Sequence, residues 1–180
     1  MKLQDKSVAQ VALVGNPNVG KSVIFGFLTG RYVSVSNYPG TTIEISRGMS
    51  SIGSKNITMI DTPGVNSLVP MSEDEQVTRN ILLNEDIDTI VQVIDAKSLR
   101  RALLITLQLA EAKLPFLLDL NMEDEAQALG VSIDKNKLSE TFGVPVVGTV
   151  AIQRKGFKDL QKKIFEAQKS SYTISYSSDI

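Results

Sequence analysis

Short runs of β-branched and aliphatic residues alternate along the chain with longer segments in which apolar residues recur at helical spacing. The apolar runs predict strands, and the periodic segments predict amphipathic helices. The expected strands are Val8–Val14, Ile43–Ser50, Ile57–Ile60, Thr89–Ile94, Pro115–Leu120 and Val144–Val147. The expected helices are Lys21–Leu28, Glu73–Asn84, Leu99–Ala112, Glu123–Leu129, Lys135–Phe142 and Phe157–Lys169, and the polar stretch Arg31–Thr42 is expected to be a loop.

This order of elements predicts an α/β fold. Strands separated by helix-length segments usually pair in parallel and are covered by helices on both faces. We therefore expect a mostly parallel six-stranded sheet with helices on both faces. Ligands of such folds bind beyond the carboxyl ends of the strands, so the residues that follow each strand are the candidates for function.

Composition narrows the possible chemistry. The 180 residues fit one domain, and a net charge of −1 argues against a broad basic surface for nucleic acid. The chain contains neither cysteine nor histidine, which removes disulfides, thiolate metal sites and the usual general base. No apolar run reaches the ~20 residues of a membrane helix, and the N-terminus lacks the core of a signal peptide, so a soluble, cytoplasmic protein is expected.

The first predicted strand runs into the sequence ALVGNPNVGKS, from Ala12 to Ser22. The spacing Gly15-x4-Gly20-Lys21-Ser22 is that of a phosphate-binding loop, in which backbone N–H groups, a lysine and a helix N-terminus hold phosphates. The alternative is a glycine-rich turn that happens to precede a helix. The residues expected at the phosphates are Gly15, Asn16, Pro17, Asn18, Val19, Gly20, Lys21, Ser22 and Val23.

Two further signals concern the magnesium ion and the third phosphate. Asp61-Thr62-Pro63-Gly64 follows a predicted strand, where a carboxylate can hold Mg²⁺-bound water and the glycine N–H can bind the γ-phosphate. Thr41 and Thr42 lie where a hydroxyl could reach Mg²⁺ only when that phosphate is present. Taken singly, the Asp-x-x-Gly motif is weak and also fits a simple turn, and the two threonines would be interpreted as surface residues that enter a strand.

Two signals concern the base. Asn121, Met122 and Asp124 follow the fifth predicted strand, where Asp124 can read guanine while Asn121 braces the phosphate loop; a helix N-cap is the alternative. Thr149-Val150-Ala151 follows the last strand and is placed to offer a backbone N–H to guanine O6. Because all these motifs occur in the correct order at strand ends, the sequence predicts a phosphate-loop GTPase.

Longer stretches resemble the cytosolic G domain of the ferrous-iron transport protein B family (FeoB). They include SNYPGTTIE, DTPGVNSL, SEDEQVTRNILLNEDIDTIVQVIDA and VPVVGTVA, and the similarity runs from about Val11 to about Lys162. The Asn-Tyr-Pro-Gly-x-Thr loop and the Leu-Asn-Glu-x-x-Asp run are more specific than the phosphate loop itself.

The resemblance implies a Ras-like GTPase fold over residues 1–169, with 170–180 as a polar tail that begins a truncated helical domain. In the complete protein it implies a membrane region that moves Fe²⁺, a place at the cytoplasmic face of the bacterial inner membrane, and small accessory Feo proteins as further partners. Ser22, Thr42 and Asp61 would serve Mg²⁺, and Gly40 would belong to the same switch as Thr42. Catalytic roles would fall to Asn18, Lys21, Thr42 and Gly64.

The family also resembles GTPases that use K⁺ in place of an arginine finger. Asn18 would offer its side-chain carbonyl to this ion, and carbonyls of the Thr42 loop would complete the shell. Such a cation neutralises charge that grows in the transition state. The alternative for Asn18 is a turn residue in the left-handed conformation.

One position departs from Ras-like proteins in general, and two depart from the local pattern of the motifs. Val65 stands where a glutamine usually orients water, which predicts slow hydrolysis stimulated by K⁺. Val150 replaces a serine of the base loop, which leaves selectivity between GTP and ATP open. Asp119 replaces a small apolar residue, and we expect it to contact solvent at the strand end.

Three other functions compete with this interpretation. A soluble ribosome-assembly GTPase shares the motifs but normally carries a basic RNA-binding appendage. A nucleotide sensor with incidental hydrolysis is compatible with Val65. Iron binding by this segment has little support, because only scattered carboxylates such as Glu73, Asp74 and Glu75 remain as ligands.

Overall fold

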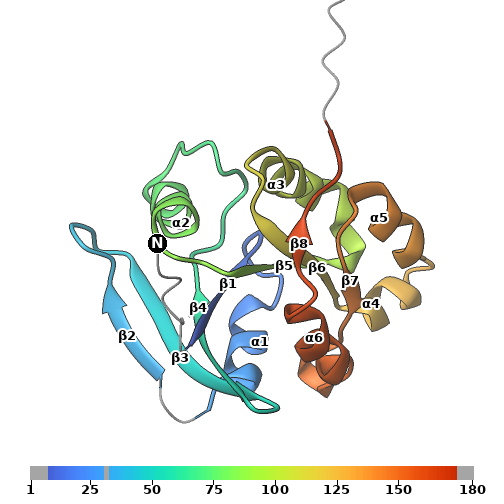
Figure 1. Ribbon diagram of the computed structural model, residues 1–180. Coiled ribbons are helices and arrows are strands. Elements are labelled where there is room, and N and C mark those ends of the chain that lie inside the picture. Colours follow the sequence, from blue (N-terminus) through green and yellow to red (C-terminus); the bar gives the residue numbers. More distant parts are fainter. Residues whose placement is uncertain (1–7, 31–32, 174–180) are drawn as a thin grey trace, which may run out of the picture.

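A twisted sheet with the strand order β2-β3-β4-β1-β5-β6-β7 forms the centre of the computed structural model, which describes residues 8–30 and 33–173 (Figure 1). A further strand, β8, pairs with β6. The strands are β1 Ala9–Val14, β2 Val33–Asn37, β3 Glu44–Ile52, β4 Lys55–Asp61, β5 Thr89–Asp95, β6 Pro115–Asn121, β7 Val146–Gly148 and β8 Gln168–Lys169.

The helices are α1 Lys21–Leu28, α2 Glu73–Asn84, α3 Leu99–Glu111, α4 Glu123–Ala128, α5 Lys135–Phe142 and α6 Phe157–Ile164. Two short 3₁₀ turns cover Ala96–Ser98 and Ala151–Gln153. The α1 and α6 helices pack on one face of the sheet, whereas α2, α3 and α5 pack on the other (Figure 1). The expected α/β class and the helical cover on both faces are therefore confirmed.

The central strands β1, β4, β5, β6 and β7 pair in parallel. In β5 the side chains from Thr89 to Ile94 are all buried, as is typical of a strand covered on both faces. Buried strands of this kind give uninterrupted apolar runs in the sequence, which explains why the sequence located them well. No helix within the described residues has the length and apolar character needed to cross a bilayer.

The predicted count of six strands is too low, because two peripheral strands were missed. The strand β2 lies inside the predicted loop Arg31–Thr42 and pairs antiparallel with β3. All five residues of β2 are exposed, so this edge strand has no buried face. Its sequence VSVSN does alternate valine with serine, but the alternation covers only four residues of a polar segment that also contains proline and glycine, so the segment as a whole favours a loop.

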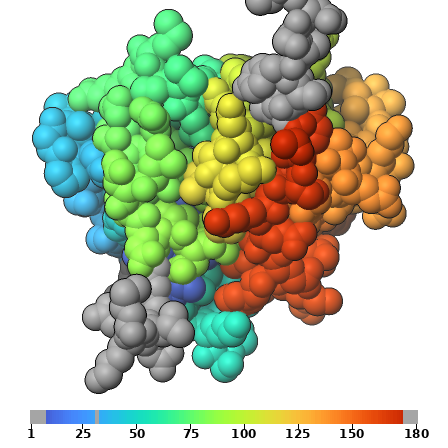
Figure 2. Space-filling model, turned by 45° about the horizontal axis from the view of Figure 1, so that its top comes forward, coloured from blue at the N-terminus to red at the C-terminus, as the bar shows by residue number. Residues whose placement is uncertain are grey.

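The second missed strand corrects the predicted helix Phe157–Lys169. The α6 helix ends at Ile164, and Gln168–Lys169 pairs antiparallel with Pro115–Phe116 at the start of β6. The space-filling view shows this red C-terminal segment lying against the yellow stretch that precedes β6 (Figure 2). The chain turns away from helix because pairing with β6 satisfies its backbone groups there.

The described beginning of the tail continues this packing. Ser170 is buried and its hydroxyl donates to the Phe142 carbonyl oxygen at the end of α5. The ring of Tyr172 lies 5.2 Å from the ring of Phe142. The remainder of the tail, residues 174–180, and the N-terminal residues 1–7 lie outside the described part of the chain.

Candidate functional site

The Gly15–Ser22 loop connects the end of β1 to the first turn of α1. Gly20 has a φ of 87°, and a Cβ atom there would lie 2.4 Å from Asn121 Nδ2. A Cβ atom on Gly15 would lie 2.3 Å from the Val93 carbonyl oxygen. Because backbone passes close to Gly15 and the Asn121 amide passes close to Gly20, a side chain at either position would force a shift, so both glycines are favoured by geometry.

The first turn of α1 has the features of an anion site. It carries neither a side-chain cap nor an acidic residue, whereas Ser72 caps α2 and Asp134 caps α5. The first N–H groups of a helix lack intrahelical partners and carry partial positive charge. The α1 N-terminus is therefore available to a negatively charged ligand.

Lys21, Ser22 and Asp61 form a cluster in front of this helix. Lys21 Nζ lies 3.1 Å from Asp61 Oδ1, and Ser22 Oγ donates to Asp61 Oδ2 at 2.7 Å. The Asp61 carboxylate thus contacts both the ammonium that the sequence assigns to phosphate and the hydroxyl that it assigns to Mg²⁺. The cluster brings together residues 40 positions apart in the chain.

The oxygen atoms of Ser22 and Asp61 are suitable ligands for a magnesium ion. Mg²⁺ prefers oxygen ligands and is usually held by one or two protein groups together with waters and phosphates. The Ser22 hydroxyl and the Asp61 carboxylate, already 2.7 Å apart, provide two such oxygens beside the phosphate loop. Thr42, the third predicted ligand, is exposed on the other loop and is not in this cluster.

The Asp61–Gly64 segment is locked onto the core. Thr62 is buried, and its hydroxyl donates to the Leu13 carbonyl oxygen at 2.8 Å. A Cβ atom on Gly64 would lie 2.9 Å from Pro17 Cα, so this segment touches the phosphate loop. Val65 is 1% exposed and its N–H donates to the Gly15 carbonyl oxygen at 3.0 Å. Its side chain thus lies in the core.

Asn16, expected at the phosphates, instead ties this loop to the segment after Asp61. Its buried amide nitrogen lies 3.2 Å from both the Val65 carbonyl oxygen and Asn66 Oδ1. Arg101 on α3 also donates to Asn66 Oδ1, at 2.9 Å. The sequence analysis missed Asn66 and Arg101, because the only signal for them was their proximity to the Asp-x-x-Gly motif.

Gly40, Thr41 and Thr42 lie in the loop between β2 and β3. Thr41 Oγ1 donates to the Tyr38 carbonyl oxygen at 3.0 Å and accepts from the Ile43 N–H at 3.1 Å. Tyr38 and Ile43 pack on a small core of β3, β4 and α2. The structure therefore places this loop near the sheet edge and does not bring Thr42 to Lys21 or Asp61.

All the predicted base residues except Thr149 line a cavity of about 70 Å³. Asn121 is buried; its Nδ2 donates to the Val19 carbonyl oxygen at 3.0 Å, and its Oδ1 accepts the Ala151 N–H at 3.0 Å. Asn121 thus links the phosphate loop to the base loop. The residues that line the cavity are Gly20, Val23, Asn121, Met122, Asp124, Glu125, Val150, Ala151 and Ile152.

The hydrogen-bonding groups expected to read the base have partners within the protein. Asp124 Oδ2 accepts from Gln153 Nε2 at 3.0 Å. The N–H groups of Thr149, Val150 and Ala151 donate to Leu120 O, Lys155 O and Asn121 Oδ1, respectively. A base that takes a hydrogen bond here must share the Ala151 N–H or displace Gln153, a residue that the sequence did not indicate.

Asp119 corrects another expectation. Its side chain is fully buried rather than in contact with solvent. Thr149 Oγ1 donates to Asp119 Oδ1 at 2.7 Å, and burial raises the pKa of the carboxyl from 3.8 to about 7. Asp119 points to the α1 and α6 side of the sheet because it alternates with Leu118 and Leu120, which pack on the opposite face.

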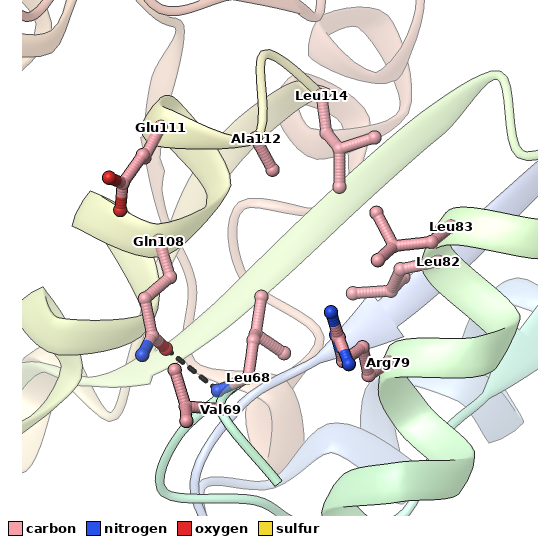
Figure 3. Close-up of a pocket in the computed structure, with 9 residues that line it drawn as sticks. All are labelled: Leu68, Val69, Arg79, Leu82, Leu83, Gln108, Glu111, Ala112 and Leu114. Carbon is pink, nitrogen blue, oxygen red and sulfur yellow. Dashed lines mark hydrogen bonds between the residues drawn. The ribbon is translucent and has the colours of Figure 1, made fainter.

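A separate apolar cavity of about 240 Å³ lies between the loop after Gly64, α2 and α3 (Figure 3). At its edge Gln108 Oε1 accepts the Leu68 N–H at 2.7 Å, while Gln108 Nε2 donates to Ser67 Oγ at 2.9 Å. Gln108 thereby fastens this loop to α3. Within residues 8–30 and 33–173, no group of three or more acidic side chains is arranged to hold a metal ion.

Comparison with known proteins agrees with this geometry. A family model described as ferrous iron transport protein B matches residues 9–164. The Fe(2+) transporter FeoB of Salmonella typhimurium is 38% identical over 158 residues, which cover 86% of this chain and 20% of the relative. The chain thus spans about one fifth of the length of the curated relatives it matches.

Two solved structures are also similar. The G domain of the T. maritima FeoB iron transporter has a TM-score of 0.81 and 36% identity, covering 88% of this chain and 98% of that chain. An S. thermophilus NFeoB mutant bound to GDP has a TM-score of 0.87 and 35% identity, covering 94% of this chain and 67% of that chain. The chain therefore belongs to the ferrous iron transport protein B family, of which it is the GTPase domain.

Proposed function

We propose that this domain binds and slowly hydrolyses GTP and thereby regulates an Fe²⁺ transporter at the cytoplasmic face of the bacterial inner membrane. Residues 1–169 would form the GTPase domain, and the tail 170–180 would lead into a helical domain and a membrane region. Small accessory Feo proteins would be further partners. The observation that carries the proposal is the convergence of Lys21 and Ser22 on Asp61 at the uncapped N-terminus of α1.

In this proposal GTP displaces the Asp61 carboxylate from Lys21. The ammonium then contacts the β- and γ-phosphates, while the N–H groups of the Gly15–Val23 loop surround them. Ser22 and Asp61 would hold Mg²⁺, directly or through water, and Thr42 would join them when its loop closes. Bound Mg²⁺ supplies neutralisation of charge on the phosphate oxygens. The Gly64 N–H would bind the γ-phosphate.

Asn18 is the proposed K⁺ ligand. It is exposed at the phosphate loop and has a φ of 65°, so its side chain is available to an ion beside the phosphates. Such an ion supplies positive charge where an arginine finger would. The burial of Val65 supports this role, because it leaves the attacking water without a side-chain partner at that position.

Base recognition is assigned to Asn121, Met122, Asp124 and the Thr149–Ala151 loop. The position of all of them except Thr149 around one cavity supports this assignment. Val150 brings no hydroxyl to the loop, so we propose weaker discrimination between GTP and ATP than in relatives with serine. The isosteric Val150→Thr variant should increase the ratio of GTP to ATP affinity, measured by calorimetry with non-hydrolysable analogues and Mg²⁺.

A nucleotide sensor with incidental hydrolysis is the second candidate, and the buried Val65 favours it. Single-turnover GTP hydrolysis in KCl and in NaCl separates the two functions. If the domain is a K⁺-stimulated GTPase, hydrolysis in KCl should be faster than in NaCl by about tenfold or more. Equal rates in both salts would support the sensor and contradict the K⁺ site.

The role of Asn18 needs a variant that keeps its backbone conformation. Asn18→Gly tolerates the φ of 65° but lacks the side-chain carbonyl, whereas Asn18→Ala combines this loss with backbone strain. We expect Asn18→Gly to retain GDP affinity and lose stimulation by K⁺. If K⁺ still stimulates hydrolysis by Asn18→Gly, the role of Asn18 is only to adopt the left-handed conformation of the turn.

A further inference from the structure

Asp119 is an acid in the core of the sheet that the proposed chemistry does not use. It lies on β6, two residues before Asn121, and its relative exposure is 0%. Its Oδ1 accepts from Thr149, whereas its Oδ2 is the buried side-chain oxygen without a hydrogen-bond partner in the described part of the chain. A buried carboxylate with a free oxygen is costly, so its presence calls for an explanation.

The surroundings of Asp119 oppose its negative charge. Its neighbours in register on β5 and β7 are Val93 and Val147, both apolar and buried. Glu123, at the start of α4, is the charged group whose field acts on it. Burial is the main cause of the raised pKa of about 7, Glu123 adds to it, and the Thr149 hydroxyl opposes it.

Thr149 connects this carboxyl to the base site. Its hydroxyl has one proton and faces two acceptors, Asp119 Oδ1 at 2.7 Å and Asn121 Oδ1 at 3.3 Å. Asn121 in turn holds the Ala151 N–H through the same Oδ1 and the Val19 carbonyl oxygen through Nδ2. The protonation state of Asp119 therefore decides which of the two acceptors receives the Thr149 hydroxyl proton. It thereby decides how many hydrogen bonds Asn121 Oδ1 accepts.

We propose that Asp119 is a positioning residue that, through Thr149, couples its own protonation to the rigidity of the base site and so to the lifetime of bound nucleotide. The proposal rests on the guanine-nucleotide site proposed above. In the ionised form the Thr149 hydroxyl donates to Asp119. In the neutral form the Asp119 hydroxyl donates to Thr149 Oγ1, which releases the Thr149 proton to donate to Asn121 Oδ1.

The direction of the effect follows from these two patterns. In the neutral form Asn121 Oδ1 accepts two hydrogen bonds, from Thr149 and Ala151, so the base loop is held more firmly. The ionised form loses one of these bonds and places a negative charge beside a site for an anionic ligand. Nucleotide release is therefore slower at acidic pH than at alkaline pH, and binding of nucleotide must by linkage favour the protonated acid.

The test measures dissociation of fluorescently labelled GDP at about pH 5.5 and about pH 8.5, on either side of the value for Asp119. The wild-type domain should release GDP roughly fivefold or more faster at the higher pH. Asp119→Asn cannot ionise, and should show a much smaller difference between the two conditions. Titration of the GDP phosphate, with a pKa of about 6, is common to both proteins and cancels in the comparison.

Thr149→Val tests whether Asp119 acts on Asn121 through the Thr149 hydroxyl. This isosteric variant keeps a buried Asp119 but cuts the path to Asn121. The stability of the nucleotide-free variant should still fall as pH rises from the ordinary pKa of 3.8 to about 7, because the folded state there holds a proton that the unfolded state has lost. Its GDP release, in contrast, should no longer change with pH in the manner of the wild type.

The outcomes distinguish the two proposals. A wild-type domain that binds no GDP at either pH refutes the proposed function. A domain that binds GDP but releases it equally fast at both pH values refutes the role of Asp119, as does an Asp119→Asn variant that keeps the wild-type pH dependence. Should Asp119→Asn not fold, the wild type and Thr149→Val alone decide the question, and equal pH dependence in these two proteins overturns the proposal.

Discussion

Lys21 Nζ lies 3.1 Å from Asp61 Oδ1, so the ammonium of the phosphate loop is paired with the carboxylate that ends β4. The side chains are only 9% and 12% exposed. Each group thus depends on the other, since an unpaired charge in such a site is costly.

Asp61→Asn should therefore destabilise the nucleotide-free domain by about 1–3 kcal/mol, because it leaves the Lys21 ammonium without a counter-ion. Urea unfolding in EDTA measures this loss. The matched control is Glu85→Gln, which breaks the more exposed Arg47–Glu85 pair and should cost less than about 1 kcal/mol. Equal effects of the two substitutions would mean that the Lys21–Asp61 pair is no more than a surface contact.

Gln108 should control the order of the loop that follows Gly64. Gln108→Ala removes the acceptor of the Leu68 N–H (Figure 3). It also removes the donor to Ser67 Oγ. We expect the Leu68 amide to exchange its hydrogen about tenfold faster in this variant, since local opening becomes easier. Ser67→Ala removes only the second contact and should leave this exchange closer to the wild-type rate. Unchanged exchange in Gln108→Ala would contradict the proposal that Gln108 fastens the loop to α3.

The sequence predicted those parts of the fold whose residues are buried. The apolar runs of β1, β5 and β6 and the motifs at their ends were located correctly, because burial on both faces leaves a continuous apolar signal. The edge strand β2 and the terminal strand β8 are exposed. Their pairing depends on backbone hydrogen bonds to distant strands, which leave little trace in composition.

The candidate site divides in the same way. The link from Asn121 to the phosphate loop followed from the motif and is present in the structure. The burial of Asp119 and the role of Gln153 as partner of Asp124 did not follow from it. Both depend on how β6, β7 and the loop after β7 come together, which is tertiary information that residue spacing does not contain.

A buried polar pair gives a test of packing away from the site. Gln92 Nε2 donates to the Ala102 carbonyl oxygen, and Thr106 Oγ1 donates to Gln92 Oε1, both at 2.9 Å. Thr106→Val should cost about 1–3 kcal/mol because it leaves Gln92 Oε1 buried without its donor. The double variant with Gln92→Leu should cost less than the sum of the two single variants, measured by thermal unfolding; strict additivity would show that the two side chains are not coupled.

Glu75 should make stability depend on pH in the acid range. Its pKa lies below the ordinary 4.5 chiefly because the Met71 N–H donates to its carboxylate at 2.9 Å, with burial opposing. The folded state thus favours the ionised form, so this stabilisation is present above the ordinary pKa and is lost as pH falls through the folded value. Glu75→Gln should reduce the slope of the unfolding free energy against pH below 4.5. An unchanged slope would mean that other carboxylic acids cause the pH dependence.

The central claim is that Lys21 in the Gly15–Ser22 loop holds the phosphates of a guanine nucleotide. Its most direct test is the affinity of Lys21→Met for fluorescently labelled GDP with Mg²⁺, with Lys163→Met as a control at a partly exposed ion pair. We predict that Lys21→Met weakens binding by about a hundredfold, while Lys163→Met binds as the wild type does. A folded Lys21→Met domain that binds GDP as tightly as the wild type would contradict the account.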